Sequence, residues 1–328
     1  MHTSTLTIQQ SFTEYISDLS LSRSTSTSKT YKNALNSFSS VLEDNKIHVY
    51  ETLANKIPEE SVIWFARSLK DYSPATERLY LTAVTLYFEY LAAQNYADIN
   101  MHRIRSLIRQ FARRPQQRMP QFPREEIDEI VVYANTLTKA LTENEADKLR
   151  NFRDRAFLLV LADTGLRVHE ACALRRGDID WLEGKAIIIG KGDREAVVRF
   201  SSRSMTAIKD YLNLRRSFDG NSGRPLSSLP IFARHDKGAG KKVLPITTTT
   251  GRNIVNQRVR ECIGESSIGA ITPHSFRHYF VTTVLRGSGG NLKLAQELAR
   301  HKNIAVTQRY AHLADDELDK GYYEIFEE

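Results

Sequence analysis

The sequence predicts a mainly helical protein with a small antiparallel β-sheet in its second half. Apolar residues recur at helical spacing through most of the chain. Between residues 179 and 200 this pattern gives way to three short runs rich in β-branched residues, which glycine-containing turns separate. Residues 115–123 contain three prolines, which disfavour any regular element. We therefore predict two domains, residues 1–114 and 124–328, joined by this linker.

The first domain is expected to be a bundle of helices. Residues 8–21 place apolar side chains on one helical face, and a Ser/Thr-rich turn at residues 22–28 supplies capping residues for the next helix. A third helix should begin at Pro58. The pair Ser73-Pro74 has the pattern of an N-cap followed by proline at the first helical position. Residues 99–114 form the last, strongly basic helix.

The second domain should combine helices with the sheet. Thr164-Gly165 ends a helix, so that Arg167 projects from the following turn. Residues 219–242 are rich in glycine, serine and basic residues, and we expect a mobile surface loop there. Residues 315–326 should form a short acidic amphipathic helix. Four further segments have helical periodicity, namely residues 125–141, 147–162, 204–216 and 252–263.

The composition favours an anionic partner inside the cell. The formal net charge is +7 and the isoelectric point is near 9.3, so nucleic acid is the simplest candidate. Cys172 and Cys262 are the two cysteines and form no CxxC pair, so neither a disulfide framework nor a zinc cluster is indicated, which suits a reducing cytoplasm. The sequence contains neither a signal peptide nor an apolar stretch long enough to span a bilayer. We therefore expect a soluble protein without a membrane partner.

The last quarter of the chain carries residues suited to phosphodiester chemistry. Cleavage needs a nucleophile, donors for the non-bridging oxygens and an acid for the leaving group. Pro273 presets a first helical turn, on which His274 and Arg277 lie three residues apart on one face. The guanidinium fork fits phosphate oxygens in bidentate fashion. With His301 and Tyr310, the segment could cleave a phosphodiester without a metal ion.

Other interpretations of these residues are weaker. His274 and His278 have the i, i+4 spacing of metal ligands, but Arg277 between them would repel a cation, and the glutamate of a zinc-protease helix is missing. Tyr310 could instead be a core tyrosine. Three other tyrosines are rival nucleophiles, namely Tyr279, which precedes an apolar run and should pack in the core, and Tyr322 and Tyr323.

Three ordered motifs together resemble the tyrosine recombinases of the phage-integrase and Xer type. The His-x-x-Arg-His segment at residues 274–278, followed by His301 and then Tyr310, is similar to the C-terminal motif of that family. Residues 164–180 resemble the segment that carries its first arginine, and residues 190–194 resemble its lysine-bearing β-turn. Each motif alone would be a modest match, whereas the three in this order are specific.

The resemblance implies a role for each matching residue. Arg167 and Arg277 would clamp the phosphate, and Tyr310 would attack it to form a 3′-phosphotyrosine. Lys191 would protonate the leaving 5′ oxygen, although a lysine in a turn is by itself most often a solvated residue.

The remaining matching residues would assist this chemistry. His274 and His301 would aid proton movement and phosphate contact, and Glu170 would support the site from behind. The family often has glycine before the second histidine, where this chain has Arg300. This departure affects helix packing or DNA contact at that position.

The same resemblance implies an architecture. Residues 1–114 would be the helical core-binding (SAM-like) DNA-binding domain, and residues 124–328 the tyrosine-recombinase catalytic domain, whose terminal helix packs on a neighbouring protomer. Beside such a site, phosphate contact becomes the better interpretation of the basic helix. Its candidate arginines are Arg103, Arg105, Arg109, Arg113 and Arg114.

The implied function is site-specific recombination of duplex DNA. Four protomers on two DNA sites would exchange strands through a Holliday junction, at the nucleoid in the cytoplasm, without metal, ATP or another cofactor. Integration, excision, resolution and transposition of a mobile element stay open, as does the need for a second recombinase. The alternatives are a type IB topoisomerase, which shares this chemistry, and a non-catalytic DNA-binding regulator.

Overall fold

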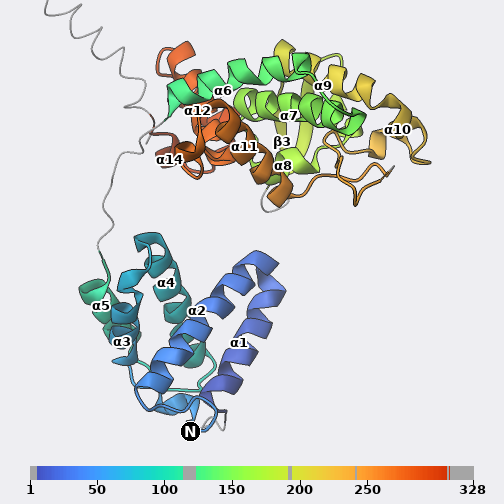
Figure 1. Ribbon diagram of the computed structural model, residues 1–328. Coiled ribbons are helices and arrows are strands. Elements are labelled where there is room, and N and C mark those ends of the chain that lie inside the picture. The colour runs from blue at the N-terminus through green and yellow to red at the C-terminus, as the bar shows by residue number, and fades with distance from the viewer. Residues whose placement is uncertain (1–5, 114–122, 191–193, 241, 309, 311–328) are drawn as a thin grey trace, which may run out of the picture. The chain divides into compact units, whose positions relative to one another are not determined.

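The chain forms two compact units, residues 1–118 and 119–328 (Figure 1). The computed structural model describes residues 6–113, 123–190, 194–240, 242–308 and 310. Both units are mainly helical, and the second contains a three-stranded antiparallel sheet, as the sequence predicts. None of the described helices is long and apolar enough to cross a membrane.

The first unit is a helical bundle whose N-caps follow the sequence pattern. The Ser24 hydroxyl accepts a hydrogen bond from the Thr27 amide, and Ser73 caps its helix in the same way, with Pro74 at the first helical position. The helices are α1 (Ile8–Ser22), α2 (Thr25–Asp44), α3 (Ser61–Ser68), α4 (Pro74–Ala93) and α5 (Met101–Phe111), with 3₁₀ turns at Ala54–Lys56 and Leu69–Asp71.

Two of the predicted helix boundaries in this unit are wrong. The third helix begins at Ser61 and not at Pro58, because the Pro58 carbonyl instead accepts the Ser61 amide in a preceding turn. The basic helix ends at Phe111, so Arg113 lies beyond it in irregular structure. Sequence patterns locate helices better than they locate helix ends.

Aromatic side chains form the core of the first unit. Phe38 of α2 lies at its centre, with its ring centroid 5.2 Å from that of Phe65 and 6.1 Å from that of Phe88. The buried Tyr87 hydroxyl is hydrogen-bonded to the Ser11 hydroxyl at 2.6 Å, which satisfies both polar groups. The bundle therefore has a hydrophobic core of its own.

The second unit surrounds one buried helix, α7 (Glu145–Thr164), whose residues 156–162 are all buried. It packs against α6 (Arg124–Thr136), α9 (Ser202–Leu214) and α12 (Pro273–Gly287) (Figure 1). The other elements are α8 (Val168–Ala173), β1 (Ile179–Asp180), β2 (Lys185–Gly190), β3 (Arg194–Arg199), α10 (Arg216–Gly220), α11 (Thr248–Cys262), α13 (Leu292–Ala299) and α14 (Ile304–Gln308), with 3₁₀ turns at Leu137–Lys139, Arg176–Asp178, Leu226–Ser228 and Glu265–Ser267.

The sheet has the order β1-β2-β3, with neighbouring strands antiparallel. Ile188 and Val198 face the core, whereas Ile187 and its partner Val197 are exposed, so burial alternates along β2 and β3. The predicted β-prone runs therefore form this sheet.

The expected mobile loop at residues 219–242 is wrong for the described part of that segment. Leu229, Ile231 and Phe232 are fully buried. The buried Arg215 guanidinium donates to the Ile231 carbonyl at 2.9 Å and to the Pro230 carbonyl at 2.8 Å. The prediction relied on the glycine and serine content of the segment and overlooked its short apolar run, which packs into the core.

We predict that Gly251→Ala destabilises the second unit. A Cβ at Gly251 would lie 2.9 Å from Cys172 Sγ and 2.9 Å from Val168 Cγ2, so α11 and α8 would have to separate. Overpacking of this kind costs about 1–3 kcal/mol, which exceeds the gain from replacing glycine inside a helix. Urea denaturation followed by circular dichroism would measure the loss. Gly220→Ala is the control, because a Cβ there meets no atom within 4 Å; equal stability of the two variants would contradict this packing argument.

Candidate active site

The N-terminal turn of α12 places the first candidate residues. The Thr272 amide donates to the Ser275 hydroxyl at 3.1 Å, and Pro273 occupies the first helical position. His274 is exposed on this turn, and partial burial of its ring together with the charges of Arg277 and Arg167 lowers its pKa. The predicted proximity of a histidine to two arginines is therefore present.

Arg277 joins three segments of the second unit. Its guanidinium is buried and donates to the Gly165 carbonyl at 2.5 Å and to the Ala299 carbonyl. These carbonyls lie at the ends of α7 and α13, where the helix dipole favours a positive charge. Burial and the charges of Arg167 and Arg300 lower the pKa of Arg277 to about 10, so the group remains charged at neutral pH.

Glu170 holds Arg167 beside this group. Its carboxylate accepts the Arg167 amide at 2.8 Å and the Arg167 Nη1 at 2.8 Å, which caps α8. The Glu170 side chain is buried, whereas 40% of the Arg167 side chain is exposed. Burial opposes ionisation of Glu170, but hydrogen bonds from Arg167 and the charges of Arg300 and Arg167 prevail and lower its pKa. Arg167 can therefore meet a ligand from solvent while Glu170 fixes its position.

Tyr310 lies at the edge of the same cluster and is only 6% exposed. Its hydroxyl is hydrogen-bonded to Nδ1 of His278, and its ring stacks on His301 with centroids 6.4 Å apart. His301 Nδ1 is bonded to the Thr307 hydroxyl at 2.9 Å. Burial and the charges of Arg277 and Arg167 lower the pKa of His301 to about 4, so its ring is neutral at pH 7.

The structure thus brings together all the candidate catalytic and supporting residues that it describes. A phenol, neutral imidazole and several guanidinium groups can bind a phosphate, attack it and move the phenolic proton. The candidates that the structure describes are Arg167, Glu170, His274, Arg277, His301 and Tyr310. Lys191, the remaining candidate, lies outside the described residues.

Residues 124–317 match the sequence model of the phage integrase family. The chain belongs to this family. It is 34% identical to the tyrosine recombinase XerC of Pediococcus pentosaceus over 193 residues, 58% of this chain and 60% of that one. The matched part is thus less than two thirds of that relative. The similarity to XerC of Thermodesulfovibrio yellowstonii is 27% identity over 308 residues, 92% of this chain and 91% of that one.

The fold is shared with solved recombinases. The structure resembles that of the site-specific recombinase XerH bound to palindromic difH substrate in a post-cleavage complex, with a TM-score of 0.67 and 19% identity. The likeness covers 92% of this chain and 80% of that one. The predicted family and fold class are therefore confirmed.

Two residues of this family member lie in the cluster without a role assigned from the sequence. His278 is the hydrogen-bond partner of Tyr310, and its ring centroid lies 4.3 Å from that of His274. The i, i+4 spacing of the two histidines was the available signal. Arg300 reaches the Glu170 carboxylate at 3.2 Å. Only the tertiary structure shows that these side chains enter the site.

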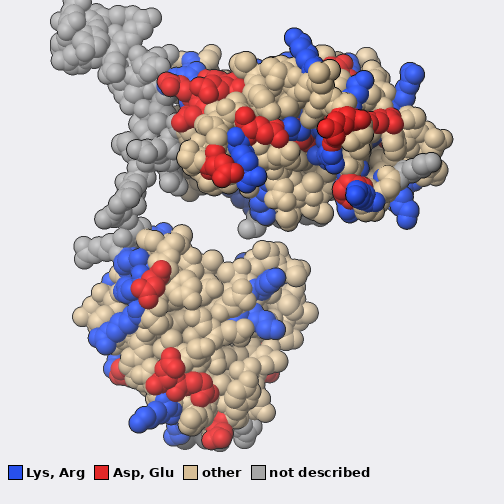
Figure 2. Space-filling model, viewed as in Figure 1, with Lys and Arg blue, Asp and Glu red and all other residues tan. Residues whose placement is uncertain are grey.

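The predicted DNA-contact arginines lie in the first unit, where most are paired with carboxylates. Arg103 bonds Glu59 and Glu60, and Arg105 bonds Glu89; these exposed pairs contribute about 0–1 kcal/mol and can exchange for phosphates. On the visible face of each unit, basic and acidic side chains are interspersed (Figure 2).

The other three arginines of this group differ from one another. Arg113 donates to the buried Glu77 carboxylate, and its amide bonds the same group at 2.9 Å, so it has a structural role in the first unit. Arg109 is exposed and has no ion pair among the described residues, while Arg114 lies outside them. Contact with DNA stays a prediction for Arg103, Arg105, Arg109, Arg113 and Arg114.

Tyr279 is engaged elsewhere in the second unit. Its hydroxyl donates to Asp128 at 2.6 Å, and burial together with this hydrogen bond raises its pKa. The raised pKa disfavours the phenolate form of Tyr279 at neutral pH. The other rival tyrosines, Tyr322 and Tyr323, lie outside the described residues.

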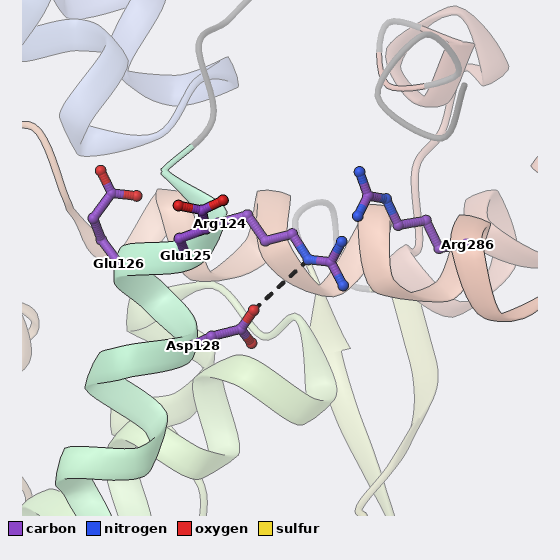
Figure 3. A pocket seen from close by; sticks show the side chains of 5 residues that line it. All are labelled: Arg124, Glu125, Glu126, Asp128 and Arg286. Carbon is purple, nitrogen blue, oxygen red and sulfur yellow. Dashed lines mark ion pairs between the residues drawn. The ribbon is translucent and has the colours of Figure 1, made fainter. Parts of the chain in front are cut away.

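A pocket of about 360 Å³ at the start of α6 shares no residue with the cluster. Figure 3 shows its lining, in which Arg124 forms an ion pair of 3.7 Å with Asp128. Glu125 and Glu126 add two further carboxylates, which would repel a phosphate. Across the described parts of the chain, no group of three or more His, Cys, Asp or Glu residues could hold a metal ion.

We predict that Glu170→Gln destabilises the second unit at neutral pH by roughly 3 kcal/mol, because it leaves the buried Arg300 guanidinium without its carboxylate and removes the partner of Arg167. The folded-state pKa of Glu170 lies below its unfolded value of about 4.3. Its stabilisation is therefore present above that pH and is lost as the pH falls through the folded-state pKa.

Urea denaturation of both proteins between pH 7 and pH 3 would test this. The difference between wild type and Glu170→Gln should shrink as the pH falls below about 4. Glu265→Gln is the control, because that side chain is 82% exposed. A difference that does not change with pH would show that the Glu170 charge is unimportant.

Proposed function

We propose that this protein is a site-specific tyrosine recombinase that cleaves and rejoins duplex DNA through a 3′-phosphotyrosine. The Tyr310 hydroxyl, bonded to a histidine beside the buried arginines, is the observation that carries the proposal. Membership of the phage integrase family and the likeness to proteins named XerC and XerH support it.

In the proposed reaction, Arg167 and Arg277 hold the non-bridging oxygens of the scissile phosphate. The Tyr310 oxygen forms a bond to phosphorus as the bond from phosphorus to the 5′ oxygen breaks. His278 accepts the phenolic proton, and Lys191 gives a proton to the leaving oxygen. One phosphate ester replaces another, so rejoining needs no ATP, metal or other cofactor.

His274 and His301 assist from either side of this centre. Burial of each ring and the charges of the nearby guanidinium groups lower the pKa of both histidines. A neutral imidazole can donate a hydrogen bond to phosphate or pass a proton onward. The proposed roles of these two histidines are therefore phosphate contact and proton movement.

The proposed assembly is four protomers on two specific DNA sites, exchanging strands through a Holliday junction. Residues 1–114 would act as the core-binding domain and residues 124–328 as the catalytic domain, acting on nucleoid DNA in the cytoplasm. The terminal segment 315–326, expected to pack on a neighbour, lies outside the described residues. A second recombinase could share the tetramer.

We expect Tyr310→Phe to abolish covalent attachment to DNA while leaving DNA binding intact, because it removes the attacking oxygen alone. Both proteins would be expressed in the source cell and denatured, and the DNA that stays attached would be digested and sequenced. Attachment at one or a few sequences, absent from the variant, is the result expected of a site-specific recombinase.

The other outcomes identify the alternatives. Attachment scattered over the genome would favour a type IB topoisomerase, which acts on arbitrary DNA. Binding by wild type without attachment would favour a DNA-binding regulator. Attachment that survives in Tyr310→Phe would show that another tyrosine is the nucleophile.

We expect His278→Gln to slow covalent attachment by about 10²–10⁴-fold, the usual contribution of a general base. DNA affinity should change little, because the proton moves only in the transition state. Single-turnover cleavage of the site found above would measure the rate, and gel retardation the affinity. His48→Gln, at an exposed histidine of the first unit outside the basic helix, is the control. An unchanged cleavage rate in His278→Gln would remove His278 from the mechanism.

A further inference from the structure

Arg300 occupies a backbone position that favours glycine. It follows the last residue of α13 with φ of 57°, one of the three non-glycine residues with positive φ in the described chain. A side chain in this left-handed region costs free energy that glycine would avoid. Such an outlier beside a candidate active site points to a function for its side chain.

The Arg300 side chain is nine-tenths buried and only partly hydrogen-bonded. Its Nη2 donates to Glu170 Oε2 at 3.2 Å and to the Gly165 carbonyl at 3.4 Å. Its Nε and Nη1 are buried and find no partner among the described residues. Unsatisfied buried donors on a charged group are costly, so these N–H groups call for an acceptor.

The charge of the cluster indicates which acceptor fits. Among the described residues, Arg167, Arg277 and Arg300 lie around one carboxylate, that of Glu170, so positive charge exceeds negative charge in this part of the site. Buried charge is stable when paired, so an anion is the type of ligand that these donors fit. A tetrahedral oxyanion with several acceptor oxygens matches the guanidinium fork.

We propose that Arg300 is a third arginine ligand of the phosphate in this site, donating from Nε and Nη1 to a non-bridging oxygen. The identification of this phosphate as part of DNA rests on the proposed function. Binding of a phosphate by the site does not depend on that function. Support of Glu170 alone would use only Nη2 and would leave the other donors unexplained.

Inorganic phosphate is the first probe, because it tests the site without DNA. The melting temperature would be measured in phosphate and in chloride at equal ionic strength for wild type, Arg300→Gly, Arg300→Lys and Arg224→Gly. Arg224 is an exposed arginine with no ion pair among the described residues, so its variant removes the same charge outside the cluster. Glycine suits the backbone at position 300, so Arg300→Gly should fold.

Phosphate should raise the melting temperature of wild type and Arg224→Gly by the same amount, because a ligand that binds only the folded state stabilises it. The rise should be at least halved in Arg300→Gly and intermediate in Arg300→Lys, which keeps the charge but not the fork. An equal rise in wild type and Arg300→Gly, or no rise in either, would overturn the proposal.

The DNA site found by covalent trapping provides the second measurement. In a Tyr310→Phe background, the slope of log affinity against log salt should fall by about one when Arg300 becomes glycine, since one phosphate contact is lost. An unchanged slope would contradict contact with DNA. Wild type could attach to no DNA while phosphate still raises its melting temperature more than that of Arg300→Gly. This outcome would contradict the recombinase proposal and would support phosphate binding by Arg300.

Discussion

The candidate site depends on one buried guanidinium. Arg277 donates to the carbonyl of Gly165 at the end of α7 and to that of Ala299 at the end of α13, so a single side chain of α12 fixes two helix termini. Both carbonyls lie where helix dipoles are negative, which offsets part of the cost of burying the cation. The turn at Gly165 has φ of 57°, and a Cβ there would lie 2.4 Å from Phe280. Glycine is therefore required at this turn, whose carbonyl accepts from Arg277.

The same positive charge sets the chemistry around it. Burial together with this charge lowers the pKa of His274 and His301. The pKa of His301 falls to about 4, so this ring is neutral at pH 7. Neutral rings can accept a proton or donate a hydrogen bond, whereas the guanidinium groups cannot lose theirs at this pH. In the proposed reaction, the arginines supply fixed charge and the histidines move protons.

Local sequence patterns predicted much of this structure. The cap at Ser73, the turn after Thr164 and the three β-prone runs depend on neighbouring residues alone, and each is confirmed. The boundary predicted at Pro58 failed because of a local turn, whereas other features depend on partners distant in sequence. Arg113 bonds Glu77, which is 36 residues away, and Arg215 holds the buried segment that was predicted to be a mobile loop. The family motifs located the arginines and Tyr310, but the bond between Tyr310 and His278 spans 32 residues and appears only in the fold.

A site with surplus buried charge links ligand binding to stability. Without an anion, Arg167, Arg277 and Arg300 repel one another, and Glu170 neutralises only part of their charge. Any phosphate that relieves this repulsion stabilises the folded state by the free energy of its binding. Glycine at position 300 would remove both the backbone strain and one of the three charges. Arg300 therefore lowers the stability of the anion-free protein and raises its affinity for an anion. Strained residues at functional sites commonly have this pair of effects.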